Sequence, residues 1–217
     1  MTAARLIAPM QERSQRSLTR MLDATERLLD QKEFDDISIA EIAEEAQVSV
    51  GNFYTRFASK EALLDVLHER YEQERVEFLS RSFAMLDAKS NNLATRVGAA
   101  TKAIVALFRS RRGVLRSLIL RHWRNPVGVS KRTHRRVDAV FAEAHALLLG
   151  ARDEIRHPNP ALAVRIGFQA VLAAAREAIV LRPLSLPGAF VVSDKDLSRE
   201  LARMLTAYLA VRTGKPS

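Results

Sequence analysis

Helical periodicity that proline does not interrupt is the feature that most constrains this chain. Proline is absent between Pro9 and Pro126, and no two glycines lie close together. Apolar residues recur at three- and four-residue spacing, as in the run Leu197, Leu201 and Leu205, which is the spacing of one face of an α-helix. No segment shows the alternating pattern of a strand. We therefore predict an all-α protein of about nine helices.

The apolar spacing also locates the helices and suggests how the chain divides. We expect helices near residues 14–31, 39–46, 50–57, 60–87, 97–108, 115–119, 137–148, 160–181 and 197–209. The eighth has a clear start, because Asn159 is a favoured N-cap and Pro160 suits the first helical position. The helices are short before residue 60 and longer after it. We predict a flexible arm at 1–13, a small three-helix domain at 14–60 and a helical bundle at 61–217.

Composition excludes several classes of protein. Of the 217 residues 47 % are hydrophobic and 27 % charged, which is enough to bury a core and argues against a disordered chain. The absence of cysteine excludes disulfides and thiolate metal sites. The longest uncharged apolar stretch, Ile166–Ala175, is far shorter than the roughly 20 residues of a membrane span. The N-terminus lacks the apolar run of a signal peptide, so we expect a cytoplasmic protein without a membrane partner.

The net charge of +9 suggests an anionic partner such as nucleic acid, but it is unevenly distributed. Residues 1–60 hold 8 lysines and arginines against 10 aspartates and glutamates, whereas residues 101–137 hold 11 basic residues and no acid. The excess of positive charge therefore lies outside the segment that carries the motif described next.

Two short helices with capping signals follow one another at residues 38–57. Ser38 and Glu41 have the spacing of a capping box, in which each side chain binds the backbone N–H of the other. That helix ends near Ala46, the chain turns at 47–49, and Ser49 is a good N-cap for the next helix. Two short helices joined by a tight turn are typical of a helix-turn-helix. A helical hairpin inside an all-α core would show the same spacing.

The second of these helices has two chemically different faces. Phe53 and Phe57 lie four residues apart and are expected to pack inward. The other side carries residue types that contact base edges, since asparagine pairs with adenine, arginine with guanine and methyl groups with thymine. These residues are Val50, Asn52, Thr55 and Arg56. The alternative is that they are simply solvated.

Three neighbouring residues favour approach to the DNA backbone. Gly51 permits close contact of main chain with a phosphate. Tyr54 carries a hydroxyl that can donate to a phosphate, and Lys60 at the next helix start can do the same.

Residues 38–63 resemble the DNA-binding domain of the TetR family. The run V-S-x-G-x-x-Y-x-x-F-x-S-K-E-x-L from Val48 to Leu63 carries the resemblance, and Phe34 also fits. The similarity covers about residues 14–63, and beyond them only helix number and length agree. The family usually has glycine where this chain has Gln47 and near Glu33. We expect either that Gln47 adopts a left-handed conformation at a cost of roughly 1 kcal/mol or that the turn differs slightly from that of the family.

The resemblance implies a transcription regulator, more often a repressor than an activator. Such proteins act as homodimers that place two recognition helices in successive major grooves of a palindromic operator, and a small molecule bound in the C-terminal domain releases the DNA. It also implies that helices near 160–182 and 194–212 form the dimer interface. The residues expected at the double-stranded DNA are Ser38, Ser49, Val50, Gly51, Asn52, Tyr54, Thr55, Arg56 and Lys60.

The C-terminal bundle contains candidates for an effector site. Aromatic residues are expected to line a cavity, and arginines at the edge of an apolar face suit a carboxylate or phosphate. These candidates are Phe83, Phe108, Arg116, Leu118, Arg121, Trp123, Phe141 and Phe168. Ordinary core packing is the alternative for the apolar candidates. For the two arginines the alternatives are a solvated, positively charged face or contacts with protein, and the chemical identity of the effector does not follow from the sequence.

Nothing in the sequence indicates catalysis or a cofactor. The five histidines show no metal-binding spacing, and neither a nucleophile elbow nor a phosphate-binding glycine loop is present. A helical enzyme that happens to contain a helix-turn-helix is therefore disfavoured. A nucleic-acid or protein-interaction module without sequence preference remains as a third hypothesis, against which the mostly uncharged outer face of residues 50–57 argues.

Overall fold

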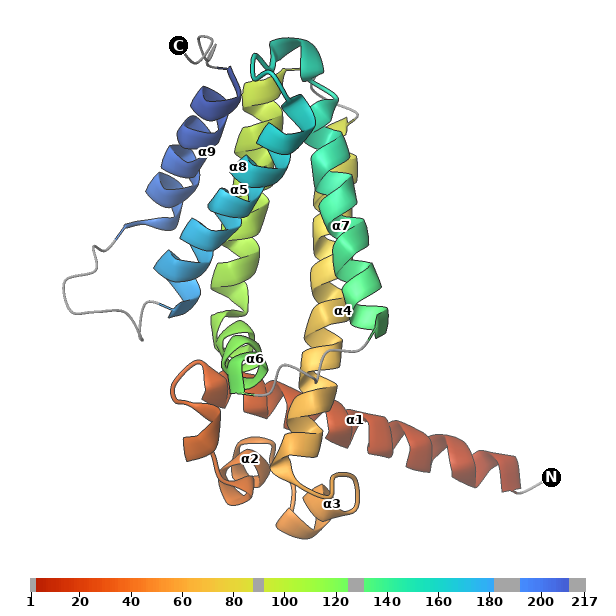
Figure 1. Ribbon diagram of the computed structural model, residues 1–217. Coiled ribbons are helices and arrows are strands. Elements are labelled where there is room, and N and C mark those ends of the chain that lie inside the picture. Colours follow the sequence, from red (N-terminus) through yellow and green to blue (C-terminus); the bar gives the residue numbers. More distant parts are fainter. Residues whose placement is uncertain (1–2, 88–91, 125–130, 182–191, 211–217) are drawn as a thin grey trace. The chain divides into compact units, whose positions relative to one another are not determined.

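The computed structural model describes residues 3–87, 92–124, 131–181 and 192–210 (Figure 1). These residues form nine α-helices and no strand, which confirms the predicted all-α class. The helices are α1 (Ala3–Leu29), α2 (Ile39–Glu45), α3 (Val50–Tyr54), α4 (Lys60–Asp87), α5 (Leu93–Ser110), α6 (Arg112–Arg124), α7 (Lys131–Leu149), α8 (Pro160–Arg176) and α9 (Asp194–Ala210). Two compact units are present: unit 1 comprises Met1–Tyr71 and Gly113–Arg124, and unit 2 comprises Glu72–Arg112 and Asn125–Ser217.

The core of unit 1 is formed by one face of α1 packed on α2, α3, the start of α4 and α6. Its fully buried side chains include Met21, Leu29, Ile42, Phe53, Leu63, Leu67 and Val114. Polar contacts at the edge of this core fix α4 on α1. Arg70 of α4 binds Asp23 at 2.6 Å and Glu26 at 3.1 Å through separate guanidinium nitrogens, and a fork of this kind holds two carboxylates with defined geometry.

Helix α6 belongs to unit 1, although we expected it in the C-terminal domain. Gly113 lies against the end of α1 so closely that a Cβ there would be 2.5 Å from the carbonyl oxygen of Leu29. Arg116 is buried and donates to the same carbonyl oxygen at 3.0 Å. Ser117 meets the buried His68 ring at 2.9 Å, and burial lowers the pKa of His68 to about 4. The expected boundary after residue 60 differs from these units because the first turns of α4 and Val114 complete the core of unit 1.

Helix α1 begins at Ala3, whereas we expected an arm at 1–13. Residues 10–20 contain neither glycine nor proline and are mostly strong helix formers, so the helix extends toward the N-terminus. Residues 1 and 2 of the expected arm lie outside the described residues.

Unit 2 is built around α5, α8 and α9, with α7 against α8 and α5. The buried face of α9 consists of Leu197, Leu201, Leu205 and Leu209, one on each successive turn. Gly167 of α8 lets this face approach closely, because a side chain there would collide with Leu205. α9 is also bound to α5. Nε and Nη2 of Arg109 in α5 both donate to the carboxylate of Asp194 at the start of α9. Carboxylates are stabilising at this end of a helix, so the ion pair and the helix dipole act together.

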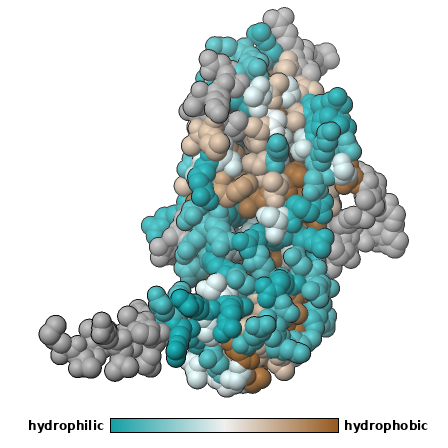
Figure 2. Space-filling view, turned by 180° about the vertical axis from the view of Figure 1, so that it is seen from behind, coloured by the Kyte–Doolittle hydropathy of each residue, from teal (hydrophilic) through white to brown (hydrophobic). Residues whose placement is uncertain are grey.

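On the face shown in Figure 2, hydrophilic residues predominate and hydrophobic ones form small groups. Among the described residues no helix has the length and the apolar character required to cross a bilayer.

We predict that Gly113→Ala lowers the free energy of unfolding by about 1–3 kcal/mol, since the new methyl group would overlap main-chain atoms that cannot rotate away. Gly98→Ala is the matched control, because a Cβ at Gly98 of α5 has no neighbour within 4 Å. There the substitution should stabilise by roughly 0.5–1 kcal/mol, as expected inside a helix. Urea unfolding of both variants tests the prediction, and an unchanged Gly113→Ala protein would contradict the packing of α6 on α1.

Candidate nucleic-acid interface

The turn between α2 and α3 is defined by caps on both helices. Ser38 Oγ accepts from the N–H of Glu41 at 3.2 Å, while the Glu41 carboxylate accepts from the N–H of Ser38 at 2.9 Å, so the predicted capping box is formed. Hydrogen bonds to Lys32 and Ser38 lower the pKa of Glu41 to about 2, which keeps the carboxylate ionised. At its other end α2 finishes with Val48 N–H bound to Ala43 O and Gln47 N–H bound to Glu44 O. This pair of bonds is a Schellman motif.

Gln47 occupies the left-handed position of that motif. Its φ is 53°, and it is the one non-glycine residue with positive φ in the described part of the chain. The first of the two expectations drawn from the missing glycine is therefore confirmed. Glu33, the other departure from the family pattern, has φ −72° and ψ 153°, which any residue adopts. It binds Arg116 at 2.9 Å instead.

The α3 segment combines a small exposed surface with two buried aromatic side chains. Ser49 caps it by accepting from the N–H of Asn52, and Phe53 and Phe57 are buried as predicted. Val50 and Tyr54 are the exposed apolar residues, with 44 % and 56 % of their surface accessible. The helix ends at Tyr54 rather than at residue 57, because the chain must turn before Ser59 caps α4 at the N–H of Ala62.

Two of the residues that we expected on the outer side of α3 are instead held by α1. Ser17 donates from Oγ to Asn52 Oδ1 at 2.8 Å, and Arg56 donates from Nη2 to Ser14 Oγ at 2.9 Å. Thr55 is exposed, and its hydroxyl donates to the carbonyl of Asn52 at 2.7 Å. Sequence reasoning missed the two serines. The sequence did contain an indication of their role, because both are small polar residues beside the apolar face of α1. Ser17 is buried there.

Lys60 has a role different from the phosphate contact that we expected. Its Nζ donates to the carbonyl oxygens of Phe34, Asp35 and Ile37 at 3.0–3.1 Å and lies 4.8 Å from the centre of the Phe34 ring. An ammonium has three N–H donors, and all three are used by the 3-10 turn Phe34–Asp36 and the residue after it. Lys60 therefore fastens α4 to the segment before α2.

Exposed cations lie on the helix that supports α3. Arg13, Arg16 and Arg20 of α1 are spaced three and four residues apart, which places them on one helix face beside Ser17. Arg16 pairs with Glu12 at 3.4 Å, whereas Arg13 and Arg20 make no hydrogen bond or ion pair with the described residues. Such unpaired arginines suit contacts to phosphate groups.

The eight candidate effector residues are divided between the two units. Phe141 and Phe168 meet edge to face with centroids 5.9 Å apart in unit 2, where Phe83 and Phe108 are buried core residues. The four residues of α6, in contrast, belong to unit 1. They are Arg116, Leu118, Arg121 and Trp123.

Each of those four has a different environment from the expected cavity wall. Leu118 packs on the core of unit 1, and Trp123 is 61 % exposed. Arg116 binds Glu33, and Arg121 binds Asp65 at 2.7 Å. The expectation that these arginines hold an anionic effector is not favoured, because α6 uses them to bind α1 and α4.

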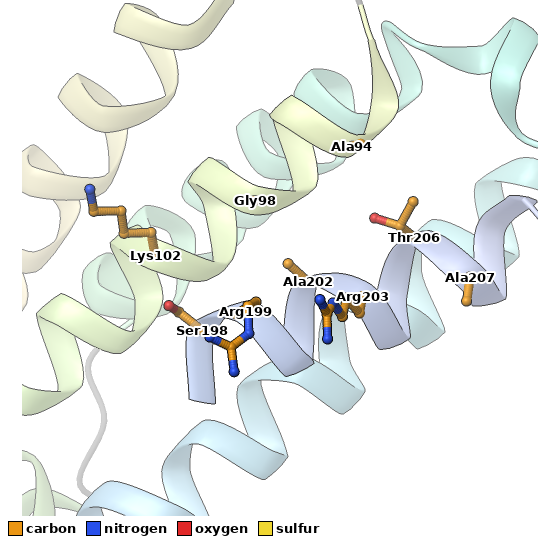
Figure 3. A pocket seen from close by; sticks show the side chains of 9 residues that line it. All are labelled: Ala94, Gly98, Lys102, Ser198, Arg199, Ala202, Arg203, Thr206 and Ala207. Atoms are coloured by element: carbon orange, nitrogen blue, oxygen red, sulfur yellow. The ribbon is translucent and has the colours of Figure 1, made fainter. Parts of the chain in front are cut away.

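Unit 2 contains a hollow elsewhere, an open groove of about 580 Å³ between α5 and α9. Figure 3 shows small side chains on both walls, with Lys102, Arg199 and Arg203 along them. Arg199 pairs with Asp196 and Glu200, and Arg203 with Glu200, so two of the three cations are partly neutralised. The remaining lining residues are Ala94, Gly98, Ser198, Ala202, Thr206 and Ala207.

A metal centre has no support in the described part of the chain, which contains no cluster of three histidine, cysteine or carboxylate residues placed to hold an ion.

A helix-turn-helix with a capped α3, followed by a helical bundle, defines the class of helical DNA-binding regulators. Residues 21–67 match the family described as bacterial regulatory proteins, tetR family. The N-terminal part of the chain is therefore similar to the DNA-binding domain of TetR-family proteins, a family of DNA-binding transcriptional regulators. No curated protein shows significant similarity to the chain.

Solved structures share the fold at low identity. A TetR-family regulator from Mesorhizobium loti MAFF303099 is 21 % identical, with a TM-score of 0.65 over 91 % of this chain and 97 % of the other. A TetR regulator from Haloarcula marismortui is 15 % identical, with a TM-score of 0.63 over 89 % and 96 %. The ketosteroid regulator KstR2 of Mycobacterium tuberculosis is 15 % identical, with a TM-score of 0.60 over 87 % and 92 %.

We predict that Lys60→Ala lowers the free energy of unfolding by on the order of 1–3 kcal/mol, since it leaves three carbonyl groups without their donor. Arg20→Ala is the matched control. It removes an exposed cation without a described partner, so it should leave stability unchanged and weaken DNA binding at low salt. Thermal melts and DNA titrations of both variants separate the roles. A stable Lys60→Ala protein with weakened DNA binding would restore the phosphate role.

Proposed function

We propose that this protein is a sequence-specific repressor of the cytoplasm, which binds a palindromic operator as a homodimer and is released by a small-molecule effector. The observation that carries the proposal is the outer surface of the α3 segment, where Val50, Gly51, Tyr54 and Thr55 are exposed. The same segment is bonded to α1 through Asn52 and Arg56. An uncharged surface of this kind distinguishes base edges better than it attracts phosphates.

In the proposed DNA interface, some residues contact the bases and set the sequence specificity, and others bind the DNA backbone. We assign base contacts to Val50, Asn52 and Thr55, and backbone contacts to Gly51, Tyr54 and the arginines of α1. Ser38 and Ser49 lie exposed at the starts of α2 and α3, where their hydroxyls serve as caps. Their part in binding would be to keep the two helix starts, with their free N–H groups, facing the DNA backbone.

The dimer proposal rests on apolar side chains that the monomer leaves uncovered. Leu162 and Ile166 of α8 lie one turn apart and are about half exposed, as are Met204 and, to a lesser degree, Tyr208 of α9. Single exposed hydrophobic residues are common, but four of them on two adjacent helices form a surface that suits a partner. A two-fold axis at this surface would pair α8 and α9 with their copies. Residues 182, 211 and 212 of the expected interface lie outside the described residues.

The effector proposal rests on the groove between α5 and α9. Its small side chains leave room for a ligand, and the exposed Lys102 supplies a cation that no described acid neutralises. We propose that an amphipathic acid would fit better here than a neutral compound. We therefore propose this groove, and not the arginines of α6, as the binding site for an anionic effector.

The proposed sequence specificity predicts the result of DNA selection from a random pool. The purified full-length protein should enrich a palindrome with half-sites about one helical turn apart or a multiple of it. Tyr54→Phe should weaken binding to all sequences alike, because it removes only a hydroxyl suited to phosphate. Enrichment of no sequence, together with binding that salt abolishes, would favour the hypothesis of a module without sequence preference.

The dimer surface can be tested with Ile166→Glu. The variant should dissociate the dimer and lose cooperative binding to the palindrome, because a buried charge without a partner is strongly unfavourable. Ala106→Glu places the same charge on an exposed position of α5 and should leave the dimer intact. Light scattering gives the mass of each. A monomeric parent protein, or a dimeric Ile166→Glu variant, would refute this interface.

A further inference from the structure

The amide of Asn52 is held in a defined orientation by a serine from another helix. Ser17 of α1 is 4 % exposed, and its hydroxyl donates to Asn52 Oδ1 at 2.8 Å. Both residues lie in unit 1, on helices whose apolar faces form one core. A buried hydroxyl gains a partner by this bond, so turning the Asn52 amide away would leave the Ser17 hydroxyl without it.

The main chain of Asn52 is fixed as well. Its N–H donates to Ser49 Oγ at 3.1 Å, and its carbonyl oxygen accepts from Thr55 Oγ1 at 2.7 Å. Of the hydrogen-bonding groups of Asn52, Nδ2 makes no bond within the described part of the chain. Asn52 therefore offers mainly N–H donors to an approaching ligand.

This orientation bears on which base the residue selects. An asparagine that pairs with adenine uses both ends of its amide, accepting from N6 at Oδ1 and donating from Nδ2 to N7. Ser17 already occupies one of the two lone pairs of Oδ1, so adenine N6 would have to share this acceptor with the Ser17 hydroxyl. Guanine presents two neighbouring acceptors, N7 and O6, in the major groove and requires only donors.

We propose that Ser17 determines base specificity by positioning Asn52, so that Asn52 selects guanine over adenine at one position of each half-site. The proposal rests on the sequence-specific DNA binding proposed above and adds a positioning residue outside the helix-turn-helix. Ser17 itself does not touch the DNA. Its effect is transmitted through the Asn52 amide alone.

A matched control exists on the same helix. Ser14 lies one turn before Ser17 and accepts from Arg56 Nη2 at 2.9 Å. Removing its hydroxyl releases a different side chain of the same segment. Ser14→Ala should therefore leave the preference at the Asn52 position unchanged.

The experiment first selects a site from a random DNA pool with the full-length protein. The position at which Asn52→Ala loses discrimination is then identified, and affinities are measured for the four bases there. The wild-type protein should prefer guanine over adenine by about tenfold, within the range of a good base contact. Ser17→Ala should reduce this ratio by at least about fivefold, and Ser17→Thr, which keeps a hydroxyl, should restore it. Ser17→Ala should have no further effect in the Asn52→Ala background.

Several outcomes would overturn the inference. One is a wild-type protein that prefers adenine at this position, a result that needs no variant. Another is a Ser17→Ala protein that weakens binding to all four bases equally, which would indicate a structural role. If the protein selects a site but Ser17→Ala leaves the guanine-to-adenine affinity ratio unchanged, this inference is refuted and the proposed function is not. A wild-type protein that enriches no sequence would refute the proposed function as well.

Discussion

The packing of one face of α1 is the interaction on which the DNA-binding unit depends. α2 and α3 are too short to be stable alone, since isolated helices below roughly 12–15 residues are marginal in water. The buried face of α1, from Ser17 through Met21 to Leu29, supplies the surface on which they fold. Ser14 and Ser17 extend this support to two polar side chains of the α3 segment, Arg56 and Asn52. Stability of the unit and orientation of its binding surface thus arise from the same helix.

The chain passes between the two units at three places: within α4 after Tyr71, at the start of α6 before Gly113, and after Arg124. α6 therefore packs in unit 1, although the residues before and after it in the sequence belong to unit 2. Gly113 and Arg116 contact the last turn of α1, while Arg121 binds Asp65 of α4. Arginine is well suited to this work because its fork binds a carbonyl and a carboxylate together. The two arginines of α6 that the sequence offered as ligand contacts, Arg116 and Arg121, bind residues of their own protein.

The sequence predicted the helical class, the main helices and the caps of the helix-turn-helix, because these depend on local periodicity and local hydrogen bonds. It also predicted the left-handed Gln47, as one of two alternatives, since a turn of this geometry is a property of a few adjacent residues. What the sequence did not predict are the tertiary partners of its polar side chains. Lys60, Asn52 and Arg116 each bind residues more than twenty positions away, and no local pattern carries that information. A polar side chain on the outer side of a helical wheel is a candidate for function only until its tertiary partners are known.

These internal partners change the physical picture of how α3 could distinguish DNA sequences. A long, freely rotating side chain adapts to several bases and loses rotamer entropy on binding, which lowers both affinity and discrimination. Asn52 and Arg56 are anchored before DNA arrives, so much of that entropy is already lost in folding. Anchoring also removes hydrogen-bonding options, since each bond within the protein satisfies one donor or acceptor that a base would otherwise use. A sequence preference can therefore reside in a buried serine that never reaches the groove, because it decides which groups of its partner remain unsatisfied.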